Sequence, residues 1–137
     1  MATHIIDKSA WIRLGDPAVP AHWPAALVAG GLAITGIVMI EILVGSRTSA
    51  QFTSDRIDLD AMPRRSINDR VIERALDVQS LMVRAGTHRA PSPADLLVAA
   101  CAELNGLAVL HYDKDFDLIA AVTGQACDWL APAGALS

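Results

Sequence analysis

Short apolar runs alternate along the chain with segments of helical periodicity. The ranges 4–6, 32–35 and 107–110 are aliphatic and too short for helices, so they predict buried strands, and 126–130 predicts an edge strand. Between them the pattern predicts helices over 9–14, 24–29, 37–44, 66–85, 93–105 and 115–123, and it is least informative over the polar segment 49–61. Strands that alternate with helices predict a short-stranded parallel sheet covered on both faces, a three-layer α/β/α sandwich.

The range 66–85 gives the clearest helical signal. Its apolar positions keep to one face through Ile67, Val71, Ala75, Val78, Met82 and Ala85. Ser66 and Asp69 have the spacing of a capping box, and Gly86 is the expected stop. Ser92 and Asp95 have the same spacing and predict the start of the next helix.

The composition favours one domain with an aliphatic core. The chain has 137 residues, of which 53% are hydrophobic and only 4% aromatic. A chain of this length buries roughly two-thirds of its unfolded surface, so we expect residues 1–137 to fold as a single domain. The high hydrophobic content excludes disorder, and the scarcity of aromatic residues argues against nucleic-acid binding by rows of stacked rings.

The cysteines and the apolar segments favour a cytoplasmic location. Cys101 and Cys127 lie in separate apolar runs and are predicted to be buried thiols. The charged residues near the N-terminus argue against a signal peptide. The range 17–40 has no Asp, Glu, Lys or Arg, but its prolines and glycines divide it into pieces shorter than the roughly 20 residues of a membrane span. We therefore expect no membrane segment.

Carboxylates follow two of the predicted strands. Asp7 comes directly after 4–6, and Asp113 and Asp115 come after 107–110. The carboxyl ends of parallel strands meet at one edge of a sheet, where α/β proteins bind ligands. Asp7 and Asp113 are also suited to capping the helices that follow them, and Asp95 to its capping box. The local pattern therefore leaves a structural role open for each.

Glu41 differs because apolar residues flank it on both sides within 37–44. A charge in apolar surroundings costs several kcal/mol unless it is compensated, and no basic residue lies three or four positions away. Clustered carboxylates also retain a proton unless a cation neutralises them. A set of oxygen ligands without His or Cys favours Mg²⁺ or Mn²⁺ over Zn²⁺, and such ions serve phosphoryl chemistry. The acids therefore predict a metal site.

Four segments together resemble the acidic motifs of PIN-domain ribonucleases, most closely the VapC toxins of bacterial toxin–antitoxin modules. They are IIDKSAW at 5–11, EIL at 41–43, PADLLVAA at 93–100 and HYDKDFDLI at 111–119, in order over essentially the whole chain. The resemblance implies a PIN-like fold and hydrolysis of RNA by water with Mg²⁺ or Mn²⁺. It also implies a cognate VapB-type antitoxin, a homodimer and an acidic metal site made of Asp7, Glu41, Asp95 and Asp113, with Asp115 as a fifth member.

Two further residues stand beside these acids. Ser9 occupies a position where the family often has a hydroxyl, so it is expected to orient Asp7 or to bind a metal-bound water. His111 departs from the family, which often has Thr or Ser two residues before the fourth acid. It is a candidate for supporting an acid by a hydrogen bond, for contacting substrate, or for a purely structural bond at the strand end.

The remaining candidates are basic and apolar. Setting aside the five acids leaves ten acidic against eleven basic residues, so the net charge of −4 does not exclude an RNA substrate. The basic residues near the acids are candidates for phosphate contacts, with simple solvation as the alternative: Lys8, Arg13, Arg47 and Lys114. Apolar residues near the N-terminus are candidates for an antitoxin-binding surface: Trp11, Leu14, Trp23 and Leu27. For the two tryptophans, a place in the core is the alternative.

Two other functions fit part of the pattern. A phosphatase that forms an aspartyl-phosphate would use Asp7 as its nucleophile, but that class expects an Asp two residues later, where this chain has Ser9. A non-catalytic binding module of the same fold would be expected to lack some of the acids, whereas this set is complete. RNA hydrolysis is therefore the leading hypothesis.

Overall fold

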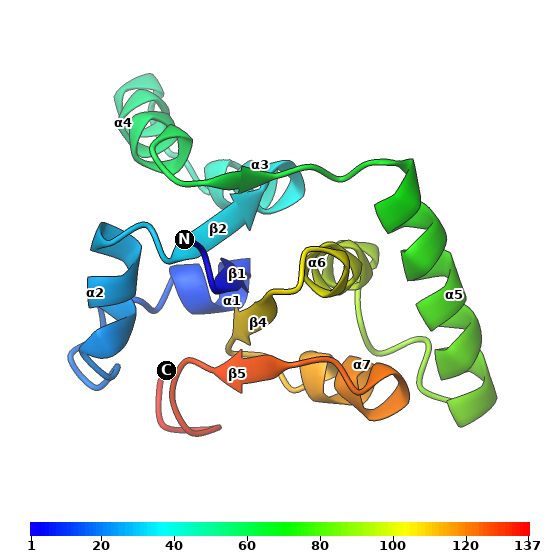
Figure 1. Ribbon diagram of the computed structural model, residues 1–137. Helices are drawn as coiled ribbons and strands as arrows, with labels where there is room; N and C mark the ends of the chain where they lie inside the picture. The colour runs from blue at the N-terminus through cyan, green and yellow to red at the C-terminus, as the bar shows by residue number, and fades with distance from the viewer.

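The computed structural model describes residues 1–137 and has one five-stranded sheet at its centre (Figure 1). All neighbouring strands are parallel, in the order β3-β2-β1-β4-β5. The strands are β1 (His4–Ile6), β2 (Leu32–Thr35), β3 (Arg64–Arg65), β4 (Ala108–His111) and β5 (Cys127–Trp129). The predicted parallel sheet is confirmed, with β3 as an additional edge strand whose two arginines gave no apolar signal.

Seven helices surround this sheet and complete the predicted three layers. They are α1 (Lys8–Trp11), α2 (His22–Val28), α3 (Gly36–Leu43), α4 (Ser49–Asp60), α5 (Asp69–Ala85), α6 (Pro93–Leu104) and α7 (Asp115–Thr123). Helix α1 packs against β4 from one face of the sheet, and α6 packs against β1 and β4 from the other (Figure 1). Helix α5 lies outside α6 and α7 and contacts both. None of the seven combines the length and the hydropathy needed to cross a membrane.

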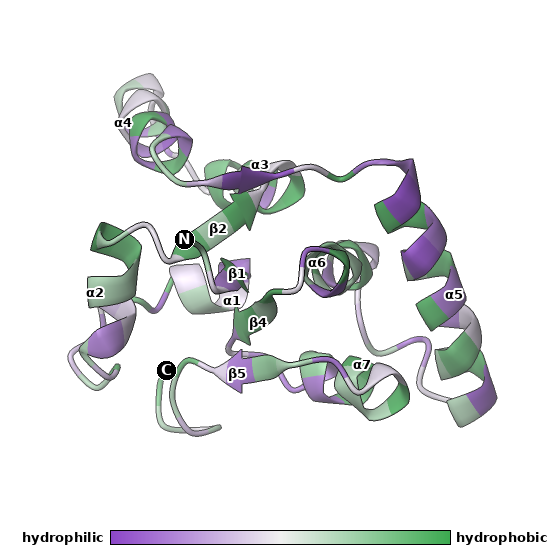
Figure 2. Ribbon diagram, in the orientation of Figure 1, coloured by the Kyte–Doolittle hydropathy of each residue, from purple (hydrophilic) through white to green (hydrophobic).

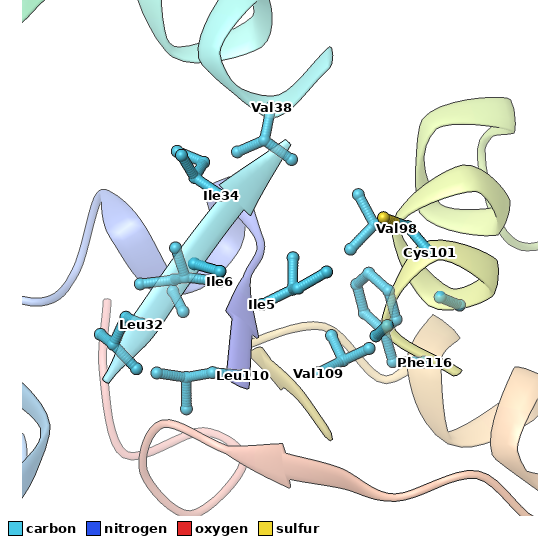
Figure 3. Packing of buried hydrophobic residues seen from close by; sticks show 14 of the residues in the cluster. Ile5, Ile6, Leu32, Ile34, Val38, Val98, Cys101, Val109, Leu110 and Phe116 are labelled. Atoms are coloured by element: carbon cyan, nitrogen blue, oxygen red, sulfur yellow. The ribbon is translucent and has the colours of Figure 1, made fainter. Parts of the chain in front are cut away.

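The central strands are buried on both of their faces. Figure 3 shows Ile5 and Val109 on the side of α6, and Ile6 and Leu110 on the opposite side. All four side chains are fully buried. Because consecutive residues of a strand point to opposite faces, a strand with helices on both sides must be apolar at every position. This explains why the central strands are continuous aliphatic runs in the sequence.

Helix α5 has the predicted apolar face but begins three residues later than expected. Hydrophobic and hydrophilic residues alternate along its ribbon (Figure 2). The buried ones are Val71, Ala75, Val78 and Met82. The predicted capping box of Ser66 and Asp69 is wrong. Asn68 has the extended backbone of an N-cap, and its Oδ1 accepts a hydrogen bond from the Val71 N–H at 3.0 Å. Ser66 instead belongs to the extended segment before the helix, and Ala85 at the other end is exposed.

The polar segment 49–61, for which the sequence pattern was least informative, contains a helix, and the two cysteines differ in burial. Residues 49–60 form α4, which buries little besides Leu59, so its sequence lacks a strong apolar face. Both cysteines are free thiols. Cys101 is buried as predicted, whereas Cys127 is only half-buried because it opens the edge strand β5.

Candidate active site

All five predicted acids line one cleft with a volume of about 370 Å³. Asp7 follows β1, Asp113 and Asp115 follow β4, and Glu41 and Asp95 come from α3 and α6. Because β1 lies between β2 and β4 in the sheet, the carboxyl ends of these strands are neighbours. The fold thus brings together side chains that are up to 108 positions apart in the sequence.

Asp7 is held by hydrogen bonds to one of its two oxygens. Its Oδ2 accepts from the Ser9 N–H at 3.0 Å and from the Ser9 hydroxyl at 2.6 Å. Asp7 therefore caps α1, as one interpretation of the sequence held, and its Oδ1 remains for the cleft. The side chain has little freedom to turn away, since the residue is only 5% exposed.

Ser9 connects the two central strands at this edge. While its hydroxyl donates to Asp7, its Oγ accepts a hydrogen bond from the Tyr112 N–H at 2.9 Å. Tyr112 directly precedes Asp113, so the hydroxyl fixes the loops after β1 and β4 relative to each other. These contacts are those expected of a residue that orients Asp7.

Asp95 also combines a cap with a place in the cleft. Its Oδ2 accepts from the Ser92 N–H at 3.0 Å, and its own N–H donates to Ser92 Oγ at 3.1 Å, which confirms the predicted capping box. Burial raises the pKa of Asp95 to about 6, and the charges of Asp7 and Asp113 act in the same direction. The hydrogen bonds with Ser92 oppose this rise without cancelling it.

Glu41 and Asp115 have raised pKa values for related reasons. Burial raises the pKa of Glu41, and the charge of Asp7 adds to the rise while Lys8 opposes it. No basic residue lies three or four positions from Glu41 in the sequence, and the cation beside it is Lys8, from another helix. Burial and the charge of Asp113 raise the pKa of Asp115, opposed by Lys114. Asp113 Oδ1 accepts the Asp115 N–H at 2.9 Å, which closes the turn between them.

This group of acids fits a hard divalent cation. Ligand oxygens of Asp95, Asp113 and Asp115 lie within 4.8 Å of one another. Three acids have pKa values raised partly by neighbouring carboxylates, so a positive charge among them would relieve the repulsion. The acids offer only carboxylate oxygens, the ligand type that Mg²⁺ and Mn²⁺ prefer.

His111 lies behind the cleft and not in it. The residue is 0% exposed, with its ring against Phe116 and Trp129 at centroid distances of 5.0 and 4.9 Å. The prediction of a substrate contact is therefore wrong, because β5 and α7 cover the side chain. Its Nδ1 accepts a hydrogen bond from the Asp113 backbone N–H at 3.2 Å, a contact that fits both the support of an acid and a structural bond at the strand end. Burial lowers the pKa of His111 and favours the neutral ring.

Two of the four predicted basic residues line the cleft. Lys8 and Arg13 do so, whereas Arg47 and Lys114 are not among its lining residues. Arg13 Nη1 donates to the Ser9 carbonyl at 2.7 Å, and its guanidinium lies 4.9 Å from the centre of the Tyr112 ring. Tyr112 thus contacts residues of the cleft in two ways, Arg13 through its ring and Ser9 through its backbone N–H. No sequence motif indicates these contacts of Tyr112, because they depend on the fold.

The apolar candidates divide between the core and the surface. Leu14 and Trp23 are only 8% and 9% exposed, so the prediction that they form a partner surface is wrong. Trp23 packs edge-on against His4 at a centroid distance of 4.9 Å, in the core. Trp11 and Leu27 instead line a groove of about 390 Å³, hereafter the α2–α4 groove, together with Val28, Gly30, Asp58, Ala61, Met62 and Pro63.

Comparisons with known proteins agree with the fold and with this placement of acids. The family model of the PIN domain matches residues 4–122. Ribonuclease VapC2 of Mycobacterium tuberculosis strain CDC 1551 / Oshkosh is 44% identical over 128 residues, which cover 92% of this chain and 91% of that protein. Ribonuclease VapC18 of M. tuberculosis strain H37Rv is 38% identical over 133 residues, covering 96% and 97%. The chain therefore belongs to the PIN-domain family, and within it to the VapC ribonucleases.

Solved structures show the same fold at lower sequence identity. A chain of the DNA-bound VapBC complex from Salmonella typhimurium aligns with a TM-score of 0.73 and 15% identity, covering 96% of this chain and 100% of that one. A chain of VapBC-5 from M. tuberculosis aligns with a TM-score of 0.63 and 21% identity, covering 96% and 99%. The PIN-like fold thus extends over nearly the full length described here.

Proposed function

We propose that the protein is a metal-dependent endoribonuclease toxin that a cognate antitoxin neutralises. The observation that carries this proposal is the convergence of five carboxylates in one cleft, three of them with raised pKa values. The relatives named ribonuclease VapC cover nearly the whole chain and support the same activity. We take residues 1–137 as a single PIN-like domain, because the central sheet uses strands from both ends of the chain.

The chemistry follows from the charges that line the cleft. Asp7, Glu41, Asp95 and Asp113, with Asp115, are the residues that would hold Mg²⁺ or Mn²⁺. When bound, the ion activates water as the nucleophile and stabilises the charge on the phosphate. Lys8 and Arg13 lie at the same cleft and are placed to bind the RNA backbone. Ser9 acts indirectly, since it keeps Asp7 and the loop of Asp113 in register.

The α2–α4 groove is our candidate surface for the VapB-type antitoxin. The similar solved chains come from VapBC complexes, in which a toxin-type chain is bound to its partner. The groove is lined mainly by apolar side chains, and Val28 at its edge is 89% exposed. An apolar segment of the antitoxin is the occupant that such a groove suits.

A homodimer and a cytoplasmic location complete the proposal. Large apolar side chains are exposed on α3, at its C-cap and on α5, which supports self-association: Ile40, Val44, Ile72 and Leu76. The cytoplasm is the compartment in which such an enzyme meets cellular RNA.

The decisive experiment incubates the purified protein with total RNA. Cleavage with Mg²⁺ or Mn²⁺ that stops on addition of a chelator is expected, and no cleavage under any of these conditions would contradict the proposal.

Expression in cells separates the toxin role from nuclease activity alone. Growth should stop when the chain is expressed alone and continue when the product of the neighbouring reading frame is co-expressed. Harmless expression of the intact chain alone would contradict the toxin role.

A further inference from the structure

A second group of metal-ligating side chains lies behind Asp113, away from the acid cleft. His111 ends β4, Asp117 lies in the first turn of α7, and Cys127 begins β5. One ligand atom from each lies within 4.8 Å of the other two. None of the three lines the acid cleft, so this group is a separate feature of the molecule.

The buried histidine has a ring nitrogen without a partner. His111 is fully buried, and its Nε2 has no hydrogen-bond partner in the structure. Buried polar atoms are nearly always partnered, and leaving one unpartnered costs about 1 to 3 kcal/mol. Because Nδ1 accepts from the Asp113 N–H, Nε2 is the nitrogen that remains for a ligand. The ring is held in place between Phe116 and Trp129.

The other two side chains have the properties of metal ligands. The Trp129 Nε1–H donates to both oxygens of Asp117, at 3.2 and 3.1 Å. Ligating carboxylates are usually oriented by such donors, and each oxygen keeps a lone pair. Cys127 is a half-buried free thiol. Burial and the charges of Asp117 and Asp128 raise its pKa, so the thiolate needs a nearby cation to form.

We propose that His111, Asp117 and Cys127 bind Zn²⁺, with water completing a tetrahedral site. A mixed set of nitrogen, oxygen and sulfur ligands suits Zn²⁺ and distinguishes this site from the all-oxygen cleft. His111 is fixed by its packing, whereas Asp117 is exposed and Cys127 half-exposed, so the latter two have room to close on the ion. Binding displaces the thiol proton of Cys127 to solvent and requires the ring proton of His111 to move from Nε2 to Nδ1, which frees the Nε2 lone pair for the ion.

Zinc binding has a consequence for Asp113 through the histidine ring. In the neutral ring, the Asp113 N–H directed at Nδ1 places the ring proton on Nε2. A metal on Nε2 requires that proton to leave, and the neutral ring then carries its proton on Nδ1. Two donors, Nδ1–H and the Asp113 N–H, would face each other at a distance that now holds a hydrogen bond. The turn carrying Asp113 must therefore shift, so we expect zinc to inhibit the proposed nuclease.

Cobalt spectroscopy tests the site itself without relying on activity. Co²⁺ bound to a thiolate gives a charge-transfer band in the near ultraviolet, which binding to the acid cleft cannot produce. The wild-type chain is expected to show this band at one equivalent of Co²⁺, and Zn²⁺ to abolish it by displacement. Cys127→Ser and Cys127→Ala should lack the band, and Asp128→Asn, the matched control one position along β5, should keep it. No band in the wild type, or a band that survives in both Cys127 variants, would overturn the proposal.

Inhibition tests the link to Asp113, and this arm rests on the proposed function. With saturating Mg²⁺, Zn²⁺ should inhibit RNA cleavage by the wild-type chain and by Asp128→Asn. Cys127→Ser should need at least about tenfold more Zn²⁺, because losing a ligand costs more than the roughly 10- to 100-fold for losing an outer partner. Equal inhibition of wild type and Cys127→Ser would overturn the link. If the wild-type chain cleaves no RNA at all, the nuclease proposal fails while the cobalt spectrum still decides the metal site.

Discussion

The acid cleft and the α2–α4 groove share the short helix α1 but differ in the charge and polarity of the side chains that line them. Lys8 and Ser9 of this helix line the cleft, whereas Trp11, one turn later, lines the groove. The cleft gathers carboxylates, which repel one another and are held by backbone hydrogen bonds. The groove gathers apolar side chains and leaves them exposed to water. We therefore expect a cation to stabilise the cleft and an apolar partner to cover the groove, so substitutions can separate the two.

The largest effect is expected in the cleft. Asp7→Asn removes a negative charge without changing the volume of the side chain, and asparagine can still accept the hydrogen bonds of Ser9. We expect RNA cleavage to fall at least about 100-fold, since a direct ligand should matter more than an outer partner. Asp95→Asn should behave alike. Asp58→Asn, an exposed acid at the groove, is the matched control and should retain full activity. Full activity in both cleft variants would mean that the acids do not hold the catalytic ion.

The complementary change is made in the groove. Val28→Asp places a charge on an 89% exposed side chain, so the fold should tolerate it while an apolar partner should not. We expect at least about tenfold weaker binding to the co-expressed antitoxin and unchanged RNA cleavage. Val83→Asp makes the same replacement at an exposed position on α5, outside the groove. Equal loss of antitoxin binding in both variants, measured by calorimetry, would show that the groove is not the binding surface.

The same comparison explains how far the sequence could predict this molecule. The sheet and the acids that follow its strands were predictable because their signals are local, whereas Glu41 and Asp95 joined the predicted site through the resemblance to the PIN-domain motifs. A central strand is aliphatic at every position, and a carboxylate directly after it must lie at the edge of the sheet. Two of the three competing cap interpretations were also correct, since Asp7 and Asp95 take part in helix caps and line the cleft at once. Asp113 is not the N-cap of α7, which is Lys114.

The groove was not predictable in the same way, because the side of α2 that a residue occupies depends on tertiary packing. Trp23 and Leu27 are both apolar residues near α2, yet Trp23 is core and Leu27 lines the groove. The role of Lys8 beside Glu41 was missed for the same reason, since the two residues are 33 positions apart. The two-residue strand β3 was missed because arginines on an edge strand carry no apolar pattern.

A substitution of Glu41 is expected to lower metal binding and RNA cleavage less than the substitution of Asp7 does. Its raised pKa reflects burial first and the charge of Asp7 second, with Lys8 as the opposing cation. Glu41→Gln should weaken Mn²⁺ binding by about tenfold or more and lower cleavage accordingly, because the ion loses a charged ligand. Calorimetric titration of both proteins with Mn²⁺ measures this difference. Unchanged affinity would mean that Lys8 alone satisfies Glu41 and that the ion does not use it.

The smallest effect concerns stability in the absence of metal. The pKa of Asp95 is about 6 in the folded protein, above its ordinary value of 3.8. Between these two pH values the folded state holds a proton that the unfolded state lacks, so this group makes the protein more stable as the pH falls. Above pH 6 the charged form is destabilising. One pKa unit corresponds to roughly 1.4 kcal/mol, so the shift sets an upper limit of about 3 kcal/mol, and solvent screening at this partly exposed group makes the actual cost smaller.

Asp95→Asn removes this destabilisation while an amide oxygen can still cap α6. In chelator at pH 8 the variant should therefore melt higher than wild type, by about 4 °C for each 1 kcal/mol recovered, and the gain should shrink as the pH falls toward 4. Adding Mg²⁺ should reverse the order, because only the wild-type cleft gains binding energy from the ion. Asp58→Asn at the groove should show neither the gain nor the reversal. Thermal melts in which Asp95→Asn is never the more stable protein at pH 8 would contradict the electrostatic account of the cleft.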